Sequence, residues 1–183
     1  MRASERLRET TAIEHKAAET RLNAASILDG SLTLADFHKM ISLHFQVWSA
    51  VADWWPNDEL AEPQADEFLG HMVEQLRLDM AANSIPATPA LSLNFSTEPA
   101  ATRYGVLYVL HGSTLGGTMI NRKLRACTSL KPLPAFHFHA ACEALPGKAW
   151  PVFLRELNAS VQTENELARA VAGAKAVFGL YLR

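Results

Sequence analysis

Apolar residues recur at intervals of three and four along most of this chain, which is the spacing of one buried face of an α-helix. One such face is formed by Phe37, Ile41, Trp48, Val51 and Trp55. No segment shows the apolar–polar alternation of a half-buried strand, and no internal repeat is present. The pattern predicts an all-α fold, and 183 residues are enough for one domain, 1–183, with its own core.

Capping residues, prolines and glycines divide this pattern into about seven helices. Ser4 can cap the first helix, Thr33 with Asp36 resembles a capping box for the second, and Pro56 ends the second. The expected helices cover residues 4–22, 33–55, 64–82, 100–127, about ten residues from 136, a segment around 150–157, and 163–182. Residues 83–99 are rich in proline and are expected to form a loop, so the prediction is a single helical bundle.

Composition excludes several functional classes. The formal net charge is −2, and no polybasic run argues for a nucleic-acid partner. No stretch of about 18 apolar residues could span a membrane, and the charged start of the chain is unlike a signal peptide. Cys127 and Cys142 are far apart and fit buried thiols in a reducing compartment. We therefore expect a cytoplasmic protein that binds neither nucleic acid nor membrane.

The segment 104–120 carries three glycines, Gly112, Gly116 and Gly117, inside an expected helix. Each glycine costs roughly 0.5–1 kcal/mol relative to alanine in a helix, so three of them require a compensating role. Gly112 and Gly116 are four residues apart and share a face, and small residues let two helix backbones touch. The alternative is a flat ligand lying against the exposed backbone. Taken alone, the glycines favour helix packing over a ligand site.

His15 is the second candidate, because it lies on the apolar stripe of the first expected helix. The other members of this stripe are Leu7, Thr11, Ala18 and Leu22. We expect its ring to point inward, with Glu19 four residues further along the same face. A carboxylate there, directly or through water, holds one imidazole nitrogen as a donor and leaves the other for a metal. The competing interpretation is a core histidine with a satisfied hydrogen bond.

Several segments, in the same order along the chain, resemble bacterial heme oxygenases that produce biliverdin. Residues 7–19 resemble the helix that carries their heme ligand, and residues 107–117 resemble their distal helix. Residues 150–154 and 172–178 are similar to their last two helices. The Gly-Ser-Thr-Leu-Gly-Gly run is the most specific of these motifs. The resemblance spans nearly the whole chain and implies a heme-oxygenase-like bundle, with heme between the first helix and the glycine-rich distal helix.

On the proximal side, the resemblance implies that His15 is the iron ligand and Glu19 its hydrogen-bonding partner. Arg8 lies almost two turns before His15 on nearly the same face, and it would pair with a heme propionate. A second cation for the propionates would come from the region 148–155, where Arg155 is the candidate.

On the distal side, the resemblance implies that Gly112, Gly116 and Gly117 let the backbone approach the heme face and the bound O₂. Tyr108 would line the same pocket. Animal-type members carry an aspartate beside the first distal glycine, where this chain has Ser113, but serine is common in the bacterial relatives. The distal site residues implied for catalysis are therefore Gly112, Ser113, Gly116 and Gly117.

The implied activity is the oxidative cleavage of heme to biliverdin, carbon monoxide and iron. Heme b is then both substrate and cofactor, and the reaction needs O₂ and reducing equivalents from a ferredoxin or a flavin reductase. A basic surface for such a donor could include Arg2, Arg6, Lys16, Arg21, Arg122, Lys123 and Arg125. A phytochrome that uses biliverdin is a possible further partner by resemblance.

His111 departs from the family, since the bacterial pattern commonly has glutamate before the first distal glycine. A histidine there can be a buried polar replacement, a hydrogen-bond partner or a second iron ligand. It lies about 100° from Gly112 around a helix, which favours the replacement role. A second ligand would instead block the O₂ position and make the chain a heme sensor or carrier without oxygenase activity. A third hypothesis is the same fold acting on another small molecule without heme.

Overall fold

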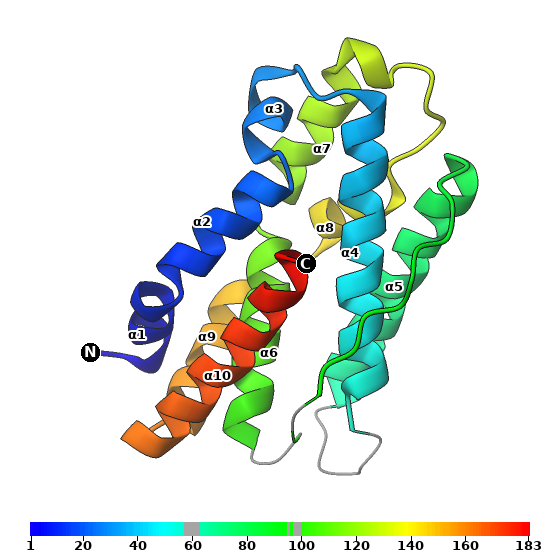
Figure 1. The fold of residues 1–183 in the computed structure, drawn as a ribbon. Coiled ribbons are helices and arrows are strands. Elements are labelled where there is room, and N and C mark those ends of the chain that lie inside the picture. Colours follow the sequence, from blue (N-terminus) through cyan, green and yellow to red (C-terminus); the bar gives the residue numbers. More distant parts are fainter. Residues whose placement is uncertain (57–62, 95, 97–99) are drawn as a thin grey trace.

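The computed structural model describes residues 1–56, 63–94, 96 and 100–183. These residues form ten α-helices and one 3-10 turn, and none of them is in a β-strand (Figure 1). The elements are α1 (Ala3–Thr10), α2 (Ala12–Arg21), α3 (Ala24–Asp29), α4 (Leu34–Trp54), α5 (Pro63–Ala82), α6 (Ala100–Ser113), α7 (Gly117–Ala126), η1 (Thr128–Leu130), α8 (His137–Ala144), α9 (Ala149–Ser160) and α10 (Glu164–Tyr181). The all-α class is confirmed, whereas the expected number of about seven helices is too low.

The first expected helix bends at Thr11 and is divided into α1 and α2. Backbone hydrogen bonds still cross the junction, from Thr11 N to Leu7 O at 3.0 Å and from His15 N to Thr11 O at 2.9 Å. The Thr11 hydroxyl also donates to the Leu7 carbonyl at 2.8 Å, and this kind of back-bonding bends helices. After α2, Asn23 adopts φ +56° and turns the chain into α3, which the apolar spacing did not predict.

The expected continuous helix over residues 100–127 is wrong, because the chain forms a turn between α6 and α7. Gly116 has φ +80°, a left-handed conformation that glycine adopts without the steric cost of a Cβ. The Thr114 hydroxyl donates to the His111 carbonyl at 2.8 Å and so satisfies one of the free carbonyls at the end of α6. One of the three glycines is therefore needed for a turn and not for a helix face.

α6 and α10 lie against each other at backbone contact distance. Gly105 of α6 faces the backbone of Ala170, and Gly173 of α10 faces the carbonyl of Thr102. A Cβ at either glycine would overlap that backbone, so the pair can only form with hydrogen at these two positions. Close backbone packing, which the sequence analysis assigned to Gly112 and Gly116, is thus carried by two other glycines.

α4, α5 and α8 pack together beside this pair, and a buried carboxylate joins two of them (Figure 1). Asp79 of α5 accepts hydrogen bonds from the backbone N–H groups of His137 at 2.6 Å and Phe138 at 2.8 Å, at the start of α8. These amides would otherwise have no partner inside the helix. Burial raises the pKa of Asp79, although the two amide hydrogen bonds act in the opposite direction.

The buried apolar side chains of the described residues form one cluster that includes members of every long helix. Both cysteines are free and buried, as expected from the sequence. The expected loop has neither helix nor strand in residues 83–94 and 96, whereas residues 95 and 97–99 lie outside the described ranges. None of the described helices is both long and apolar enough to cross a lipid bilayer.

We expect Gly105→Ala to destabilise the fold, because the added methyl group must displace the Ala170 backbone. Overpacking of this kind costs about 1–3 kcal/mol in the free energy of unfolding. Urea denaturation followed by circular dichroism measures the change. Gly70→Ala is the matched control, since nothing lies within 4 Å of its position in α5, and it should stabilise by about 0.5–1 kcal/mol. Equal effects of the two substitutions would contradict the close packing of α6 and α10.

Candidate functional site

His15 lies on α2 with one edge of its ring against α10. The imidazole meets the ring of Phe178 edge to face, with the two centroids 5.9 Å apart. Its stripe neighbours Leu7, Thr11 and Ala18 are buried, but the His15 side chain is 61% exposed. The expectation that His15 points into the interior is therefore wrong, and so is the competing interpretation of a core histidine. The ring stands on the protein surface with α10 behind it.

Glu19 has the position relative to His15 that the spacing predicted. Its Oε1 lies 3.9 Å from His15 Nδ1, and its Oε2 accepts a hydrogen bond from Lys16 Nζ at 3.2 Å. The carboxylate is thus shared between an imidazole and an ammonium group on one face of α2. A small movement of the exposed ring would bring Nδ1 into hydrogen-bonding distance, which leaves Nε2 for another ligand.

The distal glycines fall into two groups. Gly117 is buried, and a Cβ there would lie 2.6 Å from the Cys142 backbone, so this glycine serves the packing of α7 on α8. At Gly112 and Gly116 the nearest atoms to an added Cβ are side-chain atoms at ordinary van der Waals distance, 3.8 Å or more, and no backbone of another helix is packed against them. Close helix packing therefore accounts for Gly117 but not for Gly112 or Gly116.

α10 connects the two predicted halves of the site. Phe178 contacts His15, and Tyr181, three residues further along α10, lies beside Ser113 at the end of α6. Side chains three residues apart on a helix are neighbours, with Cβ atoms about 5–6 Å apart. His15 and Ser113 therefore stand over adjacent positions of α10, although they are 98 residues apart in the sequence.

A buried polar group behind Ser113 was not predicted by the sequence analysis. The Tyr181 hydroxyl lies 3.1 Å from His44 Nδ1, and the ring of His139 meets that of His44 with centroids 6.3 Å apart. Burial lowers the pKa of His44 to about 4, and burial together with the neighbouring His44 lowers that of His139 to about 3. Burial raises the pKa of the Tyr181 phenol, and the nearby Ser113 partly counteracts that rise. The group is therefore neutral at physiological pH.

Arg8, Tyr108 and Trp150 gather at one end of the site. Burial raises the pKa of Tyr108, and the positive charge of Arg8 lowers it, which places the guanidinium near the phenol. The Tyr108 ring lies 5.6 Å from the Trp150 ring, centroid to centroid. Arg155 is exposed on α9, and none of the described hydrogen bonds or ion pairs joins it to the other candidates.

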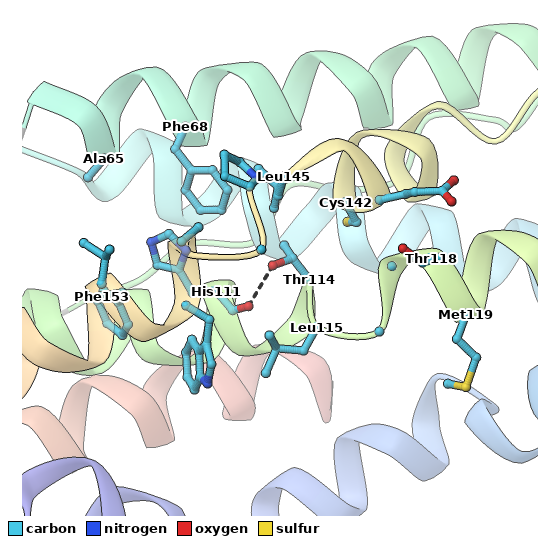
Figure 2. A pocket seen from close by; sticks show the side chains of 18 of the residues that line it. Ala65, Phe68, His111, Thr114, Leu115, Thr118, Met119, Cys142, Leu145 and Phe153 are labelled. Atoms are coloured by element: carbon cyan, nitrogen blue, oxygen red, sulfur yellow. Dashed lines mark hydrogen bonds between the residues drawn. The ribbon is translucent and has the colours of Figure 1, made fainter.

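His111 does not face His15. Its ring stacks on Phe68 of α5, with centroids 4.4 Å apart and an interplanar angle of 4°, and its other neighbour is Phe153 at 4.7 Å. Burial lowers its pKa to about 4, so the ring is neutral. Figure 2 shows His111 and Phe68 on one side of α6–α7, and Leu115 and Met119 pointing toward the opposite side. This position fits a buried polar replacement and gives no support to a second iron ligand.

A cavity of about 580 Å³ runs along the α6–α7 turn (Figure 2). Of the predicted site residues, its lining contains Gly116 and Gly117, whereas Gly112, Tyr108 and His15 are not part of it. Leu115 and Met119, which also line it, are 47% and 42% exposed. α7 packs against α3, the helix that follows α2, so these apolar side chains face the side of the molecule that carries His15.

Comparison with known proteins shows similarity to heme oxygenases. A heme oxygenase of Xanthomonas campestris pv. campestris (strain 8004) is 36% identical over 106 residues, which are 58% of this chain and 62% of that protein. The match thus spans less than two thirds of that relative's length. The NO- and CO-bound heme oxygenase from Neisseria meningitidis superimposes with a TM-score of 0.72 at 21% identity, over 99% of this chain and 88% of that one. No family model matches the chain.

The chain has the heme oxygenase fold. The resemblance to bacterial heme oxygenases that the sequence motifs indicate is confirmed by both comparisons. The roles of the individual residues remain predictions.

We expect the stability of the protein to fall as the pH drops from 6.5 to 5. His44 and His139 have lowered pKa values in the folded protein, so the unfolded chain takes up protons near pH 6.5 that the folded chain does not. Their stabilising contribution is complete above pH 6.5 and is lost toward pH 4, at up to about 1.4 kcal/mol per pH unit for each histidine. Urea denaturation at several pH values measures the slope.

His44→Asn removes one of these groups and should reduce the slope by about 1.4 kcal/mol per pH unit. His71→Asn is the control, because His71 is exposed on α5. An unchanged slope in His44→Asn would show that the buried histidines do not govern the pH dependence.

Proposed function

We propose that this protein is a heme oxygenase that binds heme between α2 and the α6–α7 turn and cleaves it to biliverdin, carbon monoxide and iron. The proposal is carried by one observation: α10 brings an exposed histidine and a segment with two glycines that no other backbone packs against to adjacent positions. A planar group of the size of a porphyrin needs a ligand on one face and a surface free of side chains on the other. The similarity to heme oxygenases in sequence and fold supports the same conclusion.

On the proximal side, His15 would supply an imidazole and Glu19 would fix its orientation. The carboxylate attracts the Nδ1 proton, so Nε2 carries the lone pair that binds iron. Phe178 supports one edge of the ring and restricts its rotation. Heme iron held by a single histidine keeps its opposite position open for O₂.

On the distal side, Gly112 and Gly116 expose backbone, and no charged side chain stands over them. The Ser113 hydroxyl donates to the Leu110 carbonyl at 2.7 Å, so its lone pairs remain available to a water molecule. Behind Ser113, the Tyr181 hydroxyl lies next to Nδ1 of the buried His44, so a proton between these two atoms is shielded from solvent. Protons for the reaction would come through water held at Ser113, while Leu115 and Met119 cover the apolar part of the ring.

The propionates would lie at the end of the site where Arg8 stands near Tyr108. Arg155 of α9 is the second cation in this proposal, and its exposed side chain is free to move toward a carboxylate. Both contacts would be with solvent-exposed groups, so each contributes modestly to affinity and mainly sets the orientation of the heme.

The reaction needs electrons, which we propose come from a ferredoxin or a flavin reductase that docks on basic side chains of α2 and α7. Two of these are held in place by backbone carbonyls: Arg21 donates to Arg183 O, and Lys123 donates to Leu28 O. A phytochrome that uses biliverdin would be a further partner. Free buried cysteines fit the reducing cytoplasm in which such donors occur.

The decisive measurement is a visible spectrum of the protein with added hemin, followed during reduction in air. We expect a sharp heme band that decays into the broad red absorption of biliverdin. His15→Ala should weaken heme binding by at least about tenfold and abolish the decay, since the iron loses its protein ligand. Added imidazole should restore the heme band of this variant.

His71→Ala is the matched control, because it removes another exposed histidine from a helix outside the site. A His15→Ala spectrum identical to that of His71→Ala would overturn the ligand assignment. A stable heme band in the unsubstituted protein, with no ring opening, would replace the oxygenase by a heme carrier. No heme band at all would leave the fold without this function.

A further inference from the structure

The indole of Trp150 lies across Gly112, the distal glycine that belongs to α6. Trp150 belongs to the first turn of α9, and its Cη2 atom is 3.9 Å from the position that a Cβ on Gly112 would take. This is an ordinary van der Waals distance, so the indole covers one side of the Gly112 backbone without compressing it. No other described side chain comes within 4 Å of that position.

A row of aromatic rings, each in contact with the next, holds the indole there. Trp150 stacks on Phe153, with centroids 5.7 Å apart and an interplanar angle of 25°. Phe153 in turn lies against His111, and His111 stacks on Phe68. Phe153 is buried, and aromatic pairs of this kind stabilise the fold beyond the effect of their buried area. Trp150 is therefore the last in a row of rings that extends from α5 to α9, and its contact with Phe153 fixes the position of the indole.

The other side of the turn has no comparable barrier. At Gly116, the atoms nearest to an added Cβ are the flexible ends of Met119 and Ile120, at 3.8 and 3.9 Å. Leu115 and Met119 are about half exposed, so their flexible side chains have room in solvent to move aside. The space over the α6–α7 turn is therefore limited by a fixed indole near Gly112, whereas beyond Gly116 it is limited only by flexible side chains.

We propose that Trp150 is a positioning residue that decides which edge of the heme lies over Gly112, and hence which meso carbon is oxidised. This inference rests on the proposed function. A planar ring between His15 and Gly112 cannot extend through the indole, so it must extend toward Leu115 and Met119. Because the four meso carbons of heme b are inequivalent, a wall on one side of the distal backbone selects among them. His111 then has an indirect role, since it supports the ring on which Trp150 rests.

The test is the isomer composition of the biliverdin formed, measured by chromatography. We expect one dominant isomer from the unsubstituted protein and from Trp150→Phe, which keeps a ring at this position. In Trp150→Ala the minor isomers together should increase by about tenfold, because the wall is lost. Trp54→Ala, a half-buried tryptophan on α4, is the matched control and should leave the isomer ratio unchanged.

A second measurement does not depend on turnover. The NMR signals of the heme methyl groups in the cyanide-bound ferric complex report how the ring is seated, and Trp150→Ala should give a second set of them. Trp150→Leu keeps apolar contact with Phe153 but shortens the wall, so it serves if the alanine variant is unfolded by circular dichroism. Heme cleavage with an unchanged isomer ratio and a single set of methyl signals would overturn the inference and leave the oxygenase intact. Absence of heme cleavage in the unsubstituted protein would overturn both.

Discussion

The backbone contact between α6 and α10 is the constraint on which the rest of the structure depends. Because Gly105 and Gly173 have no side chains, the two helices approach until the backbone at each glycine meets a backbone carbonyl of the other helix. This distance fixes where Ser113, at the end of α6, stands relative to Tyr181, at the end of α10. It also fixes Phe178, against which His15 rests. The geometry between the two halves of the site is thus set by two glycines that touch neither half.

The sequence predicted the helical class, most helix positions and the family resemblance, because these follow from local spacing and from short motifs. It did not predict the breaks at Thr11 and Gly116. The break at Thr11 comes with a hydroxyl that donates to a backbone carbonyl, and the break at Gly116 comes with a positive φ. Both interrupt a helix without changing the spacing of the apolar residues. The helix count was therefore too low, although the residues that form helices were largely right.

For the candidate site, the sequence proposed residues but did not predict their surroundings. His15 and Glu19 have the relation that their spacing implies, since i and i+4 positions meet on any helix. The assignment of Gly112 and Gly116 to close helix packing was wrong, because periodicity cannot say which helix lies opposite; of the three distal glycines, Gly117 is the one packed against another helix. The buried group of His44, Tyr181 and His139 comes from three helices, and nothing in the local sequence signals that they meet. Trp150 was counted as a core aromatic for the same reason.

The exposure of Leu115 and Met119 has a consequence for the lifetime of the folded protein in a cell. Apolar side chains that are open to solvent next to a turn are a place where chaperones, proteases and other chains can bind. A ligand that covers them stabilises the folded state in proportion to the logarithm of its free concentration relative to its dissociation constant. The lifetime of the folded chain would then depend on the free concentration of whatever ligand covers these side chains.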